Sequence, residues 1–233
     1  MHVASPPFAT RRARSYRACG RARRSSGWRG MLLGAAALAA APAASGYTVT
    51  LTPAAPLTVF LQVGVGSFTK NYISNGTPGN NTTVNKVTTT VPSTAVGDGT
   101  AQAMTTDSTQ AQSFYDSFTF CTVPSQLYIG GFYRTAGGST AAARVTATVP
   151  AALVNASGAT IPFSKIQWTS SGIADSGAEP FPAGTFVAGG VQTVGTMASN
   201  SWNESCWNFS YVNDTVPASG TFTGRVTYTL SAP

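Results

Sequence analysis

The sequence predicts an all-β protein, a single antiparallel β-sandwich of about ten strands, preceded by a cleaved signal peptide. Composition is the first reason: from residue 47 onward threonine fills 32 positions, whereas leucine fills six, lysine three and glutamate two. Threonine is β-branched and loses side-chain freedom in a helix, and good helix formers are scarce. The second reason is that apolar and polar residues alternate with period two, as in half-buried antiparallel strands.

Ten segments carry this strand pattern along the chain. In the first, the apolar residues Tyr47, Val49 and Leu51 fall on one face and threonines on the other. All ten cover residues 47–52, 57–63, 83–91, 113–120, 126–133, 143–149, 161–168, 190–197, 207–212 and 221–230. Turn signals containing Gly or Pro separate them, which is typical of a β-sandwich, with a closed barrel as the less favoured alternative. Residues 73–81 and 101–112 are predicted to be long surface loops.

The formal charge of +7 belongs to a leader and not to the domain that follows it. Eight arginines lie between Arg11 and Arg29, with no carboxylate among them. Beyond Gly46 there are six basic and seven acidic residues, so 6 − 7 = −1. A nucleic-acid partner therefore loses its support once the leader is removed.

An apolar run follows the arginines, at residues 31–44. It is shorter than the roughly twenty residues that span a bilayer, and together with the basic region it is typical of a secretory signal peptide. Small residues at 41–43 and 44–46 place the cleavage between Ala44 and Tyr47. We therefore expect a leader at residues 1–46, a domain at residues 47–233 without a transmembrane segment, and a secreted, periplasmic or cell-surface location. Two arginine pairs, at 11–12 and 23–24, leave a twin-arginine route as an alternative to general secretion.

Cysteine usage agrees with export. Cys19 lies in the leader, which leaves Cys121 and Cys206 as an even pair in the domain. In an oxidising compartment pairing is the default, so a Cys121–Cys206 disulfide is predicted, with two separate buried thiols as the alternative.

Several kinds of catalysis are excluded for the domain. The only histidine is His2, in the leader, so the exported domain has no imidazole for a Ser-His-Asp or Cys-His arrangement or for the usual zinc and copper sites. Oxidised cysteines leave no thiolate nucleophile. There is no glycine-rich phosphate loop between a strand and a helix. We expect no catalytic residue, no cofactor and no metal.

Paired carboxylates remain the one common route to hydrolysis, as in glycosidases. Asp175 and Glu179 are close in sequence, and Glu204 lies between Trp202 and Trp207, a setting that could raise its pKa. The alternative, which we favour, is that the seven carboxylates of the domain are ordinary solvated or turn residues. Asp98, in a Gly-Asp-Gly-Thr stretch, is predicted to be a turn residue.

The segment 199–212 is rich in aromatic residues around Cys206. On a regular strand Trp207, Phe209 and Tyr211 share one face while Cys206 points to the other, so a bulge or a solvent-facing bridge is expected there. Trp202 precedes the predicted strand and is expected to be the exposed aromatic. Trp202, Trp207 and Tyr211 are therefore candidate ligand or interface aromatics, with core packing as the favoured alternative. In residues 126–133, Gly130-Gly131 predicts a bulge or a close backbone approach.

The closing segment, residues 217–232 (PASGTFTGRVTYTLSA), resembles the last strand of secreted bacterial sandwich proteins, namely fimbrial subunits and the spore coat protein U type of pilus subunit. The likeness covers about sixteen residues. The family's early, closer cysteine pair is missing, since Cys121 and Cys206 lie far apart. The resemblance implies an immunoglobulin-like or pilin-like architecture at the cell surface. It would also make residues 47–52 a donor strand for a neighbouring subunit, with the first strand of its own domain as the favoured alternative.

Together these observations predict an exported structural or adhesive β-sandwich of the bacterial periplasm or cell surface, without catalysis. Its partners would be other surface or pilus subunits, joined by β-strand addition, or glycans. Two other functions stay open. The first is a carbohydrate-binding module that uses exposed aromatics, and the second, less favoured, is a glycoside hydrolase that uses carboxylates alone.

Overall fold

One long strand, β13 (Ser201–Tyr211), organises the fold of the computed structural model, which describes residues 47–233. β13 pairs antiparallel with β6 (Leu127–Arg134) through its first half and with β10 (Ile166–Ser171) through its second half. β2 (Thr58–Val63) and β11 (Gly184–Thr185) extend the sheet, whose order is β11-β10-β13-β6-β2. β1 (Thr48–Thr50) and β4 (Gln102–Ala103) complete its seven strands by pairing with opposite ends of β13.

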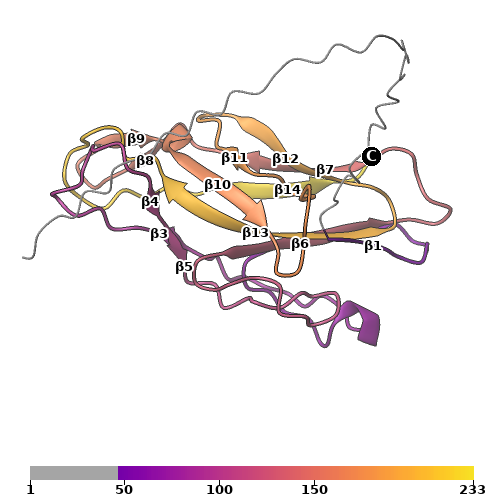
Figure 1. Ribbon diagram of the computed structural model, residues 1–233. Coiled ribbons are helices and arrows are strands. Elements are labelled where there is room, and N and C mark those ends of the chain that lie inside the picture. The colour runs from indigo at the N-terminus through magenta and orange to yellow at the C-terminus, as the bar shows by residue number, and fades with distance from the viewer. Residues whose placement is uncertain (1–46) are drawn as a thin grey trace, which may run out of the picture. The chain divides into compact units, whose positions relative to one another are not determined.

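A second, three-stranded antiparallel sheet lies above the first in Figure 1, in the order β12 (Val191–Met197), β7 (Ala143–Thr148) and β14 (Thr227–Ser231). The remaining elements are short. They are the strand pairs β3 (Val87–Thr88) with β5 (Thr105–Thr106) and β8 (Ala152–Val154) with β9 (Thr160–Pro162), and the 3-10 turns η1 (Tyr72–Ser74) and η2 (Phe163–Lys165). The predicted all-β sandwich is thus confirmed for the described residues.

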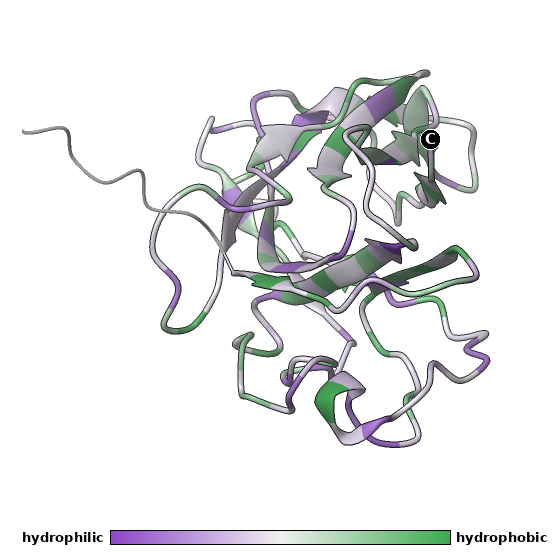
Figure 2. Cartoon of the chain, turned by 90° about the vertical axis from the view of Figure 1, so that its right-hand side faces the viewer, coloured by the Kyte–Doolittle hydropathy of each residue, from purple (hydrophilic) through white to green (hydrophobic). Residues whose placement is uncertain are grey.

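The main apolar core lies between the two sheets. The alternation predicted for β7 holds, because Ala143, Val145 and Ala147 are buried while the residues between them are more exposed. β14 sends its alternate residues, among them Tyr228 and Leu230, into the same core. Figure 2 shows hydrophobic and polar residues alternating along the strands. Burial of one face of each sheet is the main stabilising contribution of this packing.

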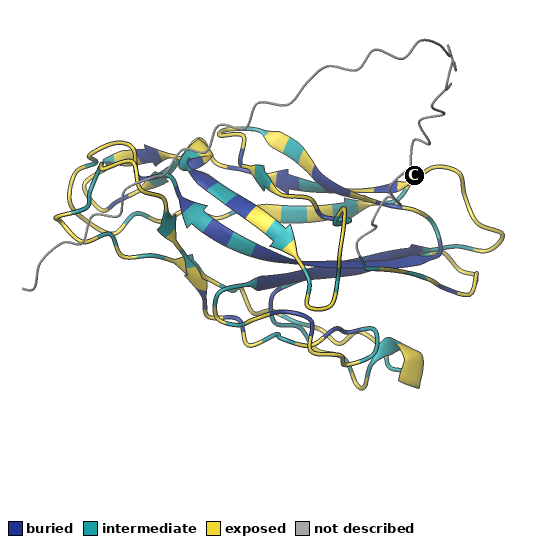
Figure 3. Cartoon of the chain, in the orientation of Figure 1, coloured by how far each residue is buried: buried dark blue, intermediate teal, exposed yellow. Residues whose placement is uncertain are grey.

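A covering segment, made of residues 64–80 and 107–126, lies against the other face of the seven-stranded sheet. It is the lower part of Figure 1, and with it residues 201–207 of β13 are buried on both faces, as Figure 3 shows. A second cluster of buried residues forms beneath it. The sheet and the N-terminal segment contribute Leu51, Phe60, Tyr128, Phe132, Trp202 and Cys206, and the covering segment contributes Phe114, Phe120 and Cys121.

Several predicted strands were wrong or incomplete. Of residues 221–230 only 227–230 lie in β14, and of residues 47–52 only 48–50 lie in β1. Residues 113–120 form a turn closed by a hydrogen bond from the Ser113 N–H to the Phe118 carbonyl, because the Asp116 side chain caps the Phe118 N–H. Residues 83–91 contain only the two-residue strand β3. Residues 161–168 are divided by η2 between β9 and β10. The predicted loop at 101–112 also contains β4 and β5, and η1 overlaps the start of the one predicted at 73–81.

The first strand, β1, pairs with β13 of its own chain, with Val49 opposite Trp202. In this structure it is therefore the first strand of its own domain, as the favoured alternative predicted. The predicted leader, with His2 and Cys19, lies outside the described residues. Within residues 47–233 no helix is long and apolar enough to cross a bilayer.

Candidate functional site

The most unusual chemical group of the described chain is the carboxylate of Glu204, which is fully buried at the middle of β13. Three side chains donate hydrogen bonds to it. The Ser113 hydroxyl lies 2.7 and 2.9 Å from its two oxygens, the Tyr128 hydroxyl lies 2.6 Å from Oε2, and Trp202 Nε1 lies 3.1 Å from the same atom. We call these four residues the Glu204 cage.

Each donor is held by a different element, which explains why the cage forms. Tyr128 projects from β6 and Trp202 from β13 two residues before Glu204, so both share its face of the sheet. Ser113 comes from the covering segment, at the turn that Phe118 closes. The cage therefore fastens the covering segment to the sheet.

Burial dominates the electrostatics of the cage. It raises the pKa of Glu204 to about 7, although the hydrogen bonds from Tyr128, Ser113 and Trp202 act in the opposite direction. The favoured prediction, that all seven carboxylates are solvated or turn residues, is therefore wrong for Glu204, whereas the alternative gave the correct direction of its pKa shift. Burial likewise raises the pKa of the Tyr128 hydroxyl, and the nearby Glu204 charge adds to the effect. Tyr128 therefore remains a donor at any physiological pH.

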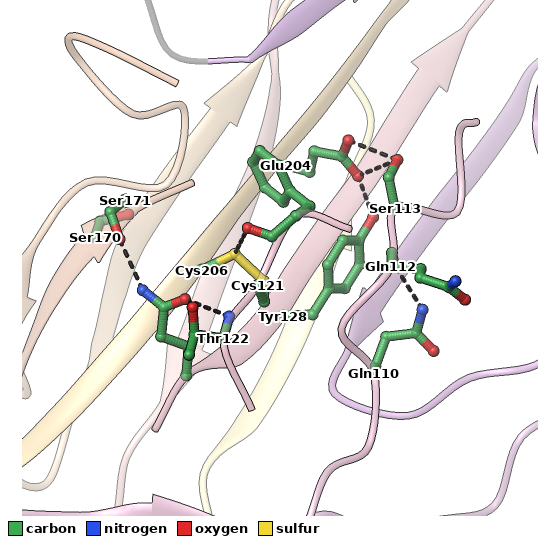
Figure 4. The surroundings of a disulfide bond; sticks show 12 residues. Gln110, Gln112, Ser113, Cys121, Thr122, Tyr128, Ser170, Ser171, Glu204 and Cys206 are labelled. Atoms are coloured by element: carbon green, nitrogen blue, oxygen red, sulfur yellow. Dashed lines mark hydrogen bonds between the residues drawn. A yellow bond between two sulfur atoms is a disulfide. The ribbon is translucent and has the colours of Figure 1, made fainter. Parts of the chain in front are cut away.

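The predicted disulfide is present beside the cage. Cys121, at the end of the covering segment, is bonded to Cys206 on β13, with a Cα–Cα distance of 5.5 Å. Both cysteines are buried. Figure 4 shows the bridge and the ring of Tyr128 near it, with the Tyr128 hydroxyl pointing toward Glu204.

The expected bulge or solvent-facing bridge at Cys206 is wrong. Trp207, Phe209 and Tyr211 face the core between the sheets, as predicted, and Cys206 faces the other way. No conflict arises, because the covering segment buries that second face as well. The pairing of β13 with β10 runs without a register shift through this region.

The candidate ligand aromatics are not on the surface. Trp202 was expected to be exposed but is 0% exposed, because β13 begins at Ser201 and carries it under the covering segment. Trp207 is buried as well and donates its Nε1–H to the Phe181 carbonyl at 3.0 Å. Tyr211 is 6% exposed, and its hydroxyl is buried without a partner. These three residues form no platform for a sugar ring.

Among the candidate carboxylates, Asp175 lies close enough to Glu179 for its charge to add to the rise in the pKa of Glu179 that burial causes. Glu204 is sealed from solvent, and Asp98 is a turn residue as predicted, accepting hydrogen bonds from the Thr100 N–H and the Asn213 side chain. Asp175 accepts a hydrogen bond from the Tyr47 N–H. Glu179 borders a surface hollow of about 360 Å³ beside β12, and burial raises its pKa.

A second hollow, of about 350 Å³, lies in the covering segment and is bordered by Ser113 together with Lys70, Gln110 and Gln112. It brings polar side chains near the cage, but the Ser113 hydroxyl is directed to Glu204 and not to the hollow. Within residues 47–233 no group of three or more His, Cys, Asp or Glu residues could hold a metal ion.

Sequence reasoning missed Ser113 and Tyr128 as partners of Glu204. One signal was available, since buried carboxylates need donors and Tyr128 lies in an apolar strand. Ser113, 91 residues away in sequence, carried no signal at all.

Three comparisons with known proteins were made for this chain. No protein-family model, no curated protein and no solved structure matches it. The described residues therefore define the protein by its fold alone. It is an all-β sandwich with a disulfide and a buried carboxylate that three side chains hydrogen-bond.

Proposed function

We propose that this chain is exported and acts as a structural or adhesive β-sandwich module of the bacterial periplasm or cell surface. The observation that carries the proposal is the buried Cys121–Cys206 bridge, which fastens the covering segment to the central strand. Such a bridge suits an oxidising compartment. The basic and apolar leader predicted at residues 1–46 supports the same location.

The Glu204 cage supports a structural role for the buried polar groups. A carboxylic acid that serves as a general acid must reach its substrate. Glu204 is instead fully buried, and three side chains donate hydrogen bonds to it. A satisfied polar network of this kind specifies how two layers dock. Three other carboxylates have ordinary partners. Asp98 and Asp107 accept hydrogen bonds from main-chain N–H groups, and Asp214 forms an ion pair with Lys165 at the surface.

An adhesive module needs surface that is free for a partner, and the sandwich offers this in its loops and at its outer strands. β12 and β14 lie at the two edges of the three-stranded sheet. Val191 of β12 is 66% exposed. Addition of a partner's strand to such an edge is the mode of assembly that the resemblance to pilus subunits implies.

The test is expression of the full chain in a Gram-negative host, followed by fractionation. The proposal expects the protein in the periplasmic or surface fraction without its leader, with neither cysteine alkylated after denaturation without reductant. Full-length protein in the cytosol with both thiols alkylated would overturn it.

A glycan array separates the structural role from a carbohydrate-binding one. The proposal expects no sugar-dependent signal, since Trp202, Trp207 and Tyr211 are all buried. Saturable binding of one glycan class by the exported protein would favour the carbohydrate-binding module instead.

A further inference from the structure

Tyr47, the residue just before β1, makes several contacts in addition to the strand pairing of β1. Its main-chain nitrogen donates to Oδ2 of Asp175 at 2.5 Å, and its hydroxyl lies 3.3 Å from Oδ2 of Asp116. Its ring packs on Phe120 with centroids 5.6 Å apart. Its carbonyl lies 3.5 Å from the Glu204 N–H, at the level of the cage.

The surroundings of this nitrogen are acidic, since Asp175 and Asp116 both contact Tyr47. In the part of the chain that the structure describes, Lys165–Asp214 is the only ion pair between a basic side chain and a carboxylate. Asp175 and Asp116 therefore have no such partner there. Of the Asp175 oxygens, Oδ1 accepts from the Ser176 N–H and Oδ2 faces Tyr47. A positive charge at the Tyr47 nitrogen would complete this site.

The sequence just before Tyr47 shows how that charge arises. Ala44 and Gly46 are small residues at the third and first positions before Tyr47, the pattern that signal peptidases cleave. We propose that export cleaves the Gly46–Tyr47 bond and that the new α-ammonium of Tyr47 forms an ion pair with Asp175, which locks β1 onto the sheet. This inference rests on the export proposed above.

The chemistry of the step is a hydrolysis. Water adds across the Gly46–Tyr47 amide, the Gly46 carbonyl carbon gains the oxygen and becomes a carboxylate, and the Tyr47 nitrogen gains protons and becomes an ammonium. The donor to the Asp175 carboxylate thereby changes from a neutral N–H to a charged ammonium, so that the hydrogen bond becomes an ion pair. The acidic groups facing this end of the chain are Asp175, Asp116 and Glu204.

The first test is the mass of the exported protein, expressed from the full chain in a Gram-negative host. The expected N-terminus is Tyr47. An exported protein that begins at any other residue overturns the inference and leaves export standing, whereas protein that keeps its leader in the cytosol overturns both.

The second test measures how fast an amine-specific reagent labels the N-terminus of the exported protein at pH 7. A free α-amino group has a pKa of about 7.7 to 8.0, and each unit by which an ion pair raises it slows labelling about tenfold. Asp175→Asn should therefore label faster than the native protein. Asp214→Asn, which breaks the exposed pair with Lys165, is the matched control and should label at the native rate.

Equal labelling rates in the native protein and Asp175→Asn would overturn the ion pair. Denatured samples of the three proteins should label alike, which shows that any difference arises from the fold. If Asp175→Asn does not accumulate, the native protein alone decides, because its N-terminus should label more slowly when folded than when denatured. Equal rates in those two states would overturn the ion pair too.

Discussion

The hydroxyl of Ser113 bridges both carboxylate oxygens of Glu204, at 2.7 and 2.9 Å, and so joins the covering segment to the central strand. The Cys121–Cys206 bridge makes a covalent connection between the same two layers. One layer boundary is thus held by a hydrogen-bonded carboxylate and a disulfide in addition to apolar packing.

Removal of the Glu204 carboxylate should destabilise the protein. Glu204→Ala leaves the hydroxyls of Ser113 and Tyr128 and the indole N–H of Trp202 without an acceptor, and each buried donor costs about 1 to 3 kcal/mol. We expect the free energy of unfolding to fall by about 3 kcal/mol or more, measured by urea titration. Glu204→Gln keeps an acceptor and should cost less than about 1.5 kcal/mol near pH 5. Equal losses in the two variants would contradict this role.

Glu204 should also make stability depend on pH. Its pKa is raised from 4.5 in the unfolded chain to about 7 in the folded protein. Between these values the folded state binds more protons than the unfolded state, so stability falls as pH rises from about 4.5 to about 7. The loss should approach about 3 kcal/mol. Urea midpoints across this range provide the measurement.

Glu204→Gln is the control for this pH effect, since it cannot titrate. The difference in unfolding free energy between native protein and Glu204→Gln isolates Glu204 from Glu179, whose pKa is also raised, mainly by burial. A difference that stays constant from pH 4.5 to 8 would contradict the raised pKa of Glu204.

Loss of the disulfide should lower the melting temperature markedly. Cys121 and Cys206 are 85 residues apart in sequence, and for a loop of that size the chain-entropy stabilisation is about 4 to 5 kcal/mol. At about 2 to 4 °C per kcal/mol, the Cys121→Ala/Cys206→Ala double variant should melt at least about 8 °C lower by calorimetry. The native protein measured without reductant is the reference. A double variant that melts with the native protein would show that the bridge is unimportant.

Tryptophan fluorescence tests the burial of Trp202. Protein without residues 1–46 contains only Trp168, Trp202 and Trp207, which are 4%, 0% and 0% exposed. Iodide, which does not enter a packed core, should therefore quench little of the native emission and most of it after unfolding. A quenchable fraction that disappears in Trp202→Phe would restore Trp202 as a surface residue.

The fold class and the faces of β13 could be predicted because they depend on local alternation, and the disulfide because a domain expected in an oxidising compartment contains only two cysteines. Alternation of Trp207, Phe209 and Tyr211 against Cys206 follows from the geometry of any strand. The burial of Trp202 could not be predicted in this way. It depends on the covering segment, which reads as polar loops and reaches its place only through contacts that are distant in sequence, such as Ser113 with Glu204.

The same reason explains the strand predicted wrongly at residues 113–120. Phe114 and Phe120 alternate with polar residues there, which indicates a strand. Both rings do become buried, but from a turn that packs on the sheet and not from a strand within it. Periodicity also places Phe118 on the same face, yet Phe118 is 48% exposed, because the chain turns at Asp116, whose side chain caps the Phe118 N–H.

The Gly130-Gly131 pair predicts a close backbone approach, and the structure contains one without a bulge, since β6 keeps continuous register with β2 and β13 through both glycines. A Cβ on Gly131 would clash with the Phe60 carbonyl oxygen, and one on Gly130 would clash with the Tyr128 hydroxyl. Both Gly131→Ala and Gly130→Ala should lower the free energy of unfolding by about 1 to 3 kcal/mol, because β2 must shift in the first variant and the Tyr128 side chain in the second.

The two variants should nevertheless differ in their pH dependence. Gly130→Ala displaces the Tyr128 hydroxyl from Glu204, and this hydrogen bond lowers the pKa of Glu204, so the pKa should rise further and the loss of stability should extend to higher pH. Gly131→Ala presses on β2 and should leave that profile unchanged. Gly190→Ala is the control for both, because its nearest neighbour would be a Val187 side-chain carbon at 3.7 Å, an ordinary contact. Identical pH profiles for Gly130→Ala and Gly131→Ala would show that Tyr128 does not set the protonation of Glu204.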